Sequence, residues 1–102
     1  PNRHDDHIRA FCFTIDKPIP EENYFNWINF LMMMAGDHIL RVKGILNIET
    51  YTHPMVIHGV QHIFHPPMPL DNWPSDDHRS KIVFITRDIE REVVENIFHA
   101  LA

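Results

Sequence analysis

The chain has 102 residues, of which 44% are hydrophobic and 23% charged, so it is long enough for one domain with one core. Fourteen Asp and Glu against nine Lys and Arg give a net charge of −5, which argues against nucleic acid or an anionic membrane as partner. The single cysteine excludes a disulfide framework, and there is no run of about 20 apolar residues to cross a bilayer. A cytoplasmic setting is therefore expected.

Histidine is the unusual residue of this composition. The chain has nine, and protonating all of them would move the formal charge from −5 to +4, so its electrostatic field should depend on pH. Residues 1–7 are polar and have no hydrophobic period. We interpret them as the end of a linker in a longer protein, and residues 8–102 as an α+β domain.

The first two elements follow from periodicity and from a helix-start signal. Residues 8–15 are apolar on both alternating faces, which predicts a strand covered on both sides. Pro20 followed by two glutamates opens a helix, because proline fits the first turn and acids there complement the helix dipole. This helix should run from about Pro20 to Ala35 and stop at Gly36. Its buried face is expected to hold Tyr24, Trp27, Ile28, Leu31 and Ala35.

The middle of the chain predicts two strands and a loop. Residues 40–49 alternate cleanly between apolar and polar, which indicates a strand with one core face. A turn over 50–54 leads to a third strand, expected from Met55 to about His65. Four prolines then exclude regular structure from 65–77, a predicted long surface loop. The core side of the second strand should carry Leu40, Val42, Leu46 and Ile48.

The last two elements complete the predicted fold. A fourth strand is expected over Lys81–Arg87, followed by a helix that Asp88 caps and that ends near Leu101. The predicted fold is a two-layer α+β sandwich: two helices on one face of a four-stranded, mainly antiparallel sheet, with ferredoxin-like character. Because the first strand is apolar on both sides, a surface outside this chain should cover part of the other sheet face. The buried stripe of the last helix should be Val93, Ile97, Phe98 and Leu101.

The sequence holds no motif for nucleotide binding or nucleophilic catalysis. Its three glycines form neither GxxxxGK[ST] nor GxGxxG. Cys12 lies in an apolar stretch and is expected to be a small core residue. An enzyme with a histidine-based site between His65 and His78 is the least favoured alternative, since no paired base and nucleophile can be placed there.

Metal binding is the natural hypothesis for so many histidines. On one strand, however, His58 and His62 would lie about 13 Å apart, too far to share an ion. The N-terminal arm is the better candidate, because a flexible segment can bend imidazoles and carboxylates around one zinc or cobalt ion. The predicted ligands are His4, Asp5, Asp6 and His7, and a merely solvated linker is the alternative.

Two cations mark the exposed sheet face. Arg41 and Lys43 are two residues apart on a strand and so share a face, and Gly44 beside them permits close backbone approach. The pair is either solvated or docked on an acidic partner.

The third strand would add to this face. If Ile57 and Ile63 point toward the helices, His58 and His62 join the two cations on the uncovered side. Protonation of the imidazoles near pH 6 would then strengthen attraction for an acidic partner.

Four short motifs stand in a specific order along the chain: residues 40–46 (LRVKGIL), His58-Gly59-Val60, Trp73 and residues 79–87 (RSKIVFITR). In this order and spacing they resemble the C-terminal domain of the CobW family of GTPases, proteins linked to metal insertion and cobalamin synthesis. The likeness extends from about His7 to Leu101.

The resemblance implies that catalysis belongs to a part of the protein outside these residues. In this family an N-terminal P-loop domain binds GTP and magnesium, and a His-rich or Asp-rich linker often joins it to the smaller α+β domain. Residues 1–7 resemble the tail of such a linker. This chain would then be a non-catalytic regulatory or docking domain of a metallochaperone GTPase, needing no cofactor beyond a metal at the arm.

The expected partners are the GTPase domain of the same protein, another protomer, or a client protein that receives the metal. A freestanding small-molecule or metal-sensing module with a ferredoxin-like sandwich is the alternative. The expected interface residues are Arg41, Lys43, Gly44, His58, Gly59, His62, Trp73 and Arg79.

Overall fold

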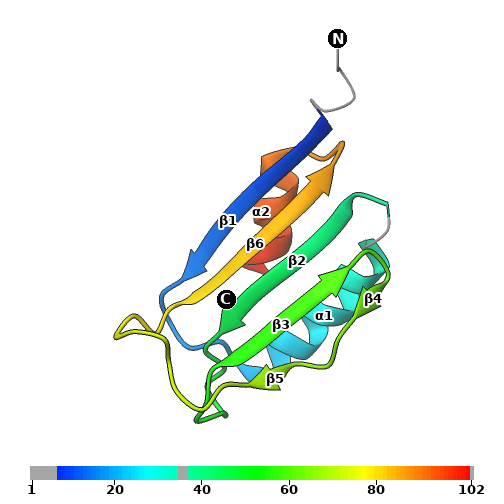
Figure 1. Ribbon diagram of the computed structural model, residues 1–102. Coiled ribbons are helices and arrows are strands. Elements are labelled where there is room, and N and C mark those ends of the chain that lie inside the picture. The colour runs from blue at the N-terminus through cyan, green and yellow to red at the C-terminus, as the bar shows by residue number, and fades with distance from the viewer. Residues whose placement is uncertain (1–6, 35–36, 102) are drawn as a thin grey trace.

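The computed structural model describes residues 7–34 and 37–101, which form six strands and two helices (Figure 1). The elements are β1 (Ile8–Ile15), α1 (Glu21–Met34), β2 (Ile39–Leu46), β3 (Met55–Val60), β4 (Ile63–Phe64), β5 (Met68–Pro69), β6 (Ser80–Arg87) and α2 (Arg91–His99). No helix within these residues has the length and apolar character needed to cross a membrane.

The strands make one antiparallel sheet in the order β1-β6-β2-β3-β4, and β5 pairs with β3. Since β6 is antiparallel to both of its neighbours, β1 and β2 run parallel, with β6 between them and α1 as their connection. This is the split β-α-β unit of ferredoxin-like folds, although here the second helix follows the last strand. Both helices lie behind the same sheet face in Figure 1, so the expected two-layer α+β fold is confirmed.

The number of strands differs from the expected four. The third strand breaks after Val60, where Gln61 takes a positive φ of 52° and the chain turns back. Val60 then pairs with Ile63 across the turn, which creates β4. Two residues of the proline-rich loop, Met68 and Pro69, add β5 to the other end of β3. A proline is tolerated there because an edge strand need not donate every N–H.

The core lies between the sheet and the helices, and α1 supplies the expected face. Tyr24, Trp27 and Leu31 are buried, and Ile28 packs partly buried beside them. The indole Nε1 of Trp27 donates to the carbonyl of Ile97 in α2 at 2.9 Å, which ties the two helices together. Ala35 and Gly36, the expected end of α1, lie outside the described residues.

The start and buried stripe of α2 differ from the prediction. Asp88 has a φ of 56° and lies in a bend, while Glu90 is the N-cap residue and makes no side-chain capping bond. Val93 is 42% exposed, and Val94 is buried in its place. The buried residues are spaced three or four apart, so they lie on one face of the helix: Val94, Ile97, Phe98 and Leu101. Val93 is one residue away from this pattern and therefore points to solvent.

A register shift in β2 changes which residue enters the core. The pairing with β6 shifts between Ile39 and Arg41, so Ile39 is 1% exposed and Leu40 is only half-buried. Beyond the shift the alternation holds, and Val42, Leu46 and Ile48 are buried as expected.

β1 is covered on one side only. Phe11, Phe13 and Ile15 face the core, whereas Cys12 between them is exposed. The expectation of a core cysteine is therefore wrong, because no element of the described chain covers the second face of this strand. That face belongs to the surface described next.

Candidate docking surface on the open sheet face

The sheet face opposite the helices carries a surface of apolar and cationic side chains, which we call the open face. The register defines it, because residues paired directly across antiparallel strands point to the same side. Lys43 pairs with His58 on one side and with Val83 on the other, and Val83 pairs with Cys12. A second row, one step along, is formed by Ala10, Ile85, Arg41, Val60 and Ile63.

Large apolar side chains are exposed across this face. Val83 at its centre is 40% exposed, and Ile63 at its edge is 67% exposed. Arg41 and Lys43 of β2 lie between the apolar residues of β6 and those of β3 and β4. Exposed apolar side chains gathered on one face are typical of an interaction surface. The expectation that Ile63 points to the helices is wrong, because the turn at Gln61 reverses the strand and places Ile63 beside Val60. Ile57 does face the helices and is buried, as expected.

Arg41 and Lys43 are two adjacent cations at the middle of the open face. Neither has a carboxylate partner among the residues that the structure describes. In a chain of net charge −5 with fourteen acids, two adjacent cations left without an internal counter-charge are available to an external one.

His58 stands beside these cations. Its ring stacks on that of His65, with centroids 5.3 Å apart and planes 22° apart, and Nε2 of His58 is closed to solvent without a hydrogen-bond partner. Desolvation, followed by the charges of Arg41, His65 and Lys43, lowers the pKa of His58 below its ordinary value. The imidazole is therefore neutral at neutral pH, and an acidic partner would favour its charged form.

Three of the expected interface residues do not lie on this face. His62 is exposed in the turn between β3 and β4. Gly44 and Gly59 face the helices: a Cβ at Gly44 would lie 2.7 Å from the carbonyl oxygen of Lys81, and one at Gly59 would lie 2.7 Å from the ring of Phe64. Both glycines therefore serve close packing inside the domain, and the close approach expected of Gly44 on the exposed face does not occur there.

Trp73 and His78 hold the long loop together. Their rings stack with centroids 4.7 Å apart, and Asn47, the residue after β2, donates through Nδ2 to the carbonyl of His78 at 3.1 Å. Trp73 is half-buried within this arrangement, so it positions the loop beside the sheet.

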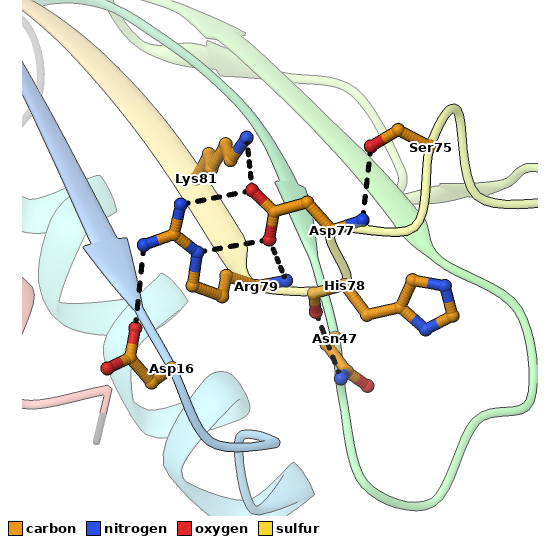
Figure 2. A network of polar contacts seen from close by, with 7 residues as sticks. All are labelled: Asp16, Asn47, Ser75, Asp77, His78, Arg79 and Lys81. Carbon is orange, nitrogen blue, oxygen red and sulfur yellow. Dashed lines mark hydrogen bonds and ion pairs between the residues drawn. The ribbon is translucent and has the colours of Figure 1, made fainter.

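Arg79, in contrast to Arg41, is neutralised inside the chain (Figure 2). Its Nε and Nη2 donate to the two carboxylate oxygens of Asp77, each at 3.0 Å, and its Nη1 lies 3.8 Å from Asp16. Lys81 adds its Nζ to Asp77 at 2.8 Å. These hydrogen bonds, that of Arg79 first, hold the pKa of Asp77 well below its usual range and raise that of Arg79.

This network predicts a measurable acid titration. Because the folded pKa of Asp77 is depressed, its stabilising effect is present above the unfolded value near 3.9 and is lost as the pH falls below it. Carbonyl-detected NMR should show the Asp77 carboxylate ionised below pH 3.9, and Arg79→Met should raise its pKa. Lys17→Met, a charge change in an exposed loop, is the control. An ordinary pKa for Asp77 in the unmodified chain would contradict the geometry.

The predicted metal ligands lie mostly outside the described residues, which exclude His4, Asp5 and Asp6. The fourth, His7, has its Nδ1 2.6 Å from Oδ1 of Asp88, so this ring is already paired with a carboxylate. Within residues 7–34 and 37–101, no group of three or more His, Cys, Asp or Glu could hold a metal ion.

Sequence reasoning missed His65 and Met68 as neighbours of the open face. Both follow the turn at Gln61, and a Gln-His turn lacks the Asn-Gly or Asp-Gly signal that predicts a tight hairpin. Only the return of β4 and β5 alongside β3 brings them back to the sheet.

The family profile described as the cobalamin synthesis protein cobW C-terminal domain matches residues 8–102. The chain belongs to this family. The motifs LRVKGIL and HGV that carried the resemblance form β2 and the end of β3, which are the two strands that display Arg41, Lys43 and His58.

Two solved structures share the fold. The crystal structure of the Zn(II)-bound YjiA GTPase from E. coli has a TM-score of 0.80 and 23% identity, over 94% of this chain and 30% of that one. The crystal structure of a Zn(II)-bound triple mutant of YjiA GTPase gives the same TM-score and identity, over 93% and 30%. This CobW C-terminal domain thus spans less than a third of either GTPase chain, and it contains no P-loop motif. No curated protein sequence matches the chain significantly.

Proposed function

We propose that this chain is the non-catalytic docking domain of a cytoplasmic CobW-type GTPase with a metallochaperone role, and that its open face contacts the GTPase domain of the same protein. The observation that carries the proposal is the pair of free cations, Arg41 and Lys43, on an apolar sheet face of an acidic chain. The similarity to 30% of a GTPase chain supports it, because the larger part of such a protein would lie beside this domain.

The chemistry of the open face defines what its partner needs. Apolar side chains such as Val83 and Val60 gain free energy when another apolar surface displaces water from them. Arg41 and Lys43 add selectivity, because a partner without acidic groups would bury them uncompensated. The matching surface is therefore apolar with carboxylates opposite these two residues. A second protomer or a client protein would have to offer the same surface.

Cys12 allows a direct test, because it is exposed on the open face beside Val83. In the full-length protein, alkylation of Cys12 should be at least about tenfold slower than in this chain alone, because docking closes access to the thiol. Peptide-resolved mass spectrometry after timed iodoacetamide labelling measures the rate.

The matched control is Thr52→Cys, placed in an exposed turn away from the open face. Its labelling rate should be equal in both proteins. Equal rates for Cys12 would overturn docking on the GTPase domain. Slowing that depends on protein concentration would instead assign the face to a second protomer.

The proposed metal site at the arm has its own test. Zinc or cobalt should bind this chain with release of protons, since imidazole ligands must be deprotonated. Deleting residues 1–6, which keeps the contact of His7 with Asp88, should remove most of the binding and leave thermal unfolding unchanged. Calorimetry in two buffers of different ionisation enthalpy measures both effects. Zinc affinity that survives the deletion would place the site among the histidines of the fold.

A further inference from the structure

A hollow of about 550 Å³ opens on the sheet face between β3 and the segment that follows β4. Its size falls in the range of small-molecule pockets. The hairpin at Gln61 creates it, because the returning chain makes a second wall opposite β3. Its lining residues are Lys43, Val56, His58, His65, Pro66 and Met68.

The walls combine apolar surface with positive charge. Val56, Pro66 and Met68 supply aliphatic contacts, and Lys43 supplies an ammonium group without a carboxylate partner among the described residues. The charged or titratable groups that act on His58 are Arg41 and Lys43 from β2 and His65 from the opposite wall, and none of them is an acid.

This combination selects a class of ligand. A cation would be repelled, and a neutral apolar molecule would bury Lys43 without compensation. A phosphate dianion calls for several converging donors or a bidentate guanidinium, whereas Lys43 is the one permanently charged group of the lining. A carboxylate on an apolar body satisfies both the ammonium group and the aliphatic walls.

We propose that this hollow binds a small organic carboxylate, with Lys43 holding the carboxylate and Val56, Pro66 and Met68 contacting its apolar part. The hollow shares Lys43 and His58 with the open face, so a bound carboxylate and a docked partner domain would compete for Lys43. Ligand binding can nevertheless be tested in this chain by itself.

His58 makes the proposed binding depend on pH. Burial and the neighbouring cations keep its imidazole neutral at neutral pH. A bound carboxylate opposes both effects and favours protonation, so binding takes up a proton. Affinity should therefore rise as the pH falls through the ordinary imidazole value near 6.5, where a carboxylic acid stays ionised.

The test is an NMR titration of this 102-residue chain with phenylbutyrate and with phenylbutanol, its uncharged counterpart. Phenylbutyrate should shift the amide signals of Lys43, Val56 and His58 and bind at least about tenfold more tightly than the alcohol. Lys43→Met, which keeps the aliphatic stem, should remove that preference. His58→Phe should retain binding and lose the pH dependence. Lys17→Met, a lysine remote from the hollow, should change neither.

Each contrary result overturns the proposal in its own way. Equal affinity for the alcohol would show a merely apolar hollow, and shifts elsewhere would show a different site. No binding of either probe at millimolar concentration would show that the hollow takes no such ligand. None of these outcomes bears on Cys12 protection in the full-length protein, so the docking proposal stands or falls separately.

Discussion

Replacing Phe84 with alanine is expected to lower the free energy of unfolding by about 3–5 kcal/mol, the range for a fully buried phenylalanine. Phe84 is 0% exposed at the centre of β6. Its ring meets those of Phe13, Trp27 and Phe98 at centroid distances of 6.0, 6.3 and 6.5 Å. Removing it leaves a cavity between the sheet and both helices, and a domain of this size has only about 5–15 kcal/mol of stability to lose.

The control is Val83→Ala, the preceding residue on the same strand. Val83 points to the open face and is 40% exposed, so its truncation should cost no more than about 1 kcal/mol. Urea unfolding followed by circular dichroism measures both variants. Equal losses would contradict the assignment of one covered and one open face to β6.

The double change Arg41→Ala with Lys43→Ala is expected to separate docking from folding. In this chain alone, thermal unfolding should be nearly unchanged, because exposed charges without partners contribute little to stability. In the full-length protein, loss of two charge-assisted contacts should weaken interdomain association by at least about thirtyfold, since such contacts contribute about 1–3 kcal/mol each. The alkylation rate of Cys12 should then rise toward its value in this chain, and GTP turnover should change.

Lys17→Ala is the matched control, because Lys17 is exposed and lies in the loop before α1. It should alter neither Cys12 labelling nor turnover. Either of two results would contradict a docking role for Arg41 and Lys43. One is a loss of several kcal/mol in the isolated chain, and the other is unchanged labelling and turnover in the full-length protein.

The sequence by itself determined most of the elements and the family. Pro20 and the glutamates after it begin a helix whose 3.6-residue period correctly placed Tyr24, Trp27 and Leu31 in the core. The order of helices and strands then predicted the α+β class, and the ordered motifs identified the CobW C-terminal domain. These features are local: they depend on spacing and on backbone preferences within one segment, which a single sequence displays.

The same reasoning predicted only part of the candidate docking surface. Alternation in β2 placed Arg41 and Lys43 on one face, and His58 joined them as expected. His62 did not, because the chain turns at Gln61 and His62 lies in that turn. The sequence did not predict the turn, since it contains none of the residues that favour a tight hairpin. Arg79 was predicted to be an interface cation, but in the fold its charge is paired with Asp77 and Asp16, and Lys81 also contacts Asp77.

The tertiary structure alone decided which apolar residues are covered. Cys12 and Phe13 are neighbours in one apolar strand, yet only Phe13 is buried, because both helices pack on a single face of the sheet. The meeting of His58 with His65, and the hollow beside them, likewise require β4 to fold back on β3. Periodicity shows how apolar and polar side chains alternate within one segment. Whether an apolar side chain is buried depends on contacts between segments far apart in the chain, and these contacts form only when the whole domain packs.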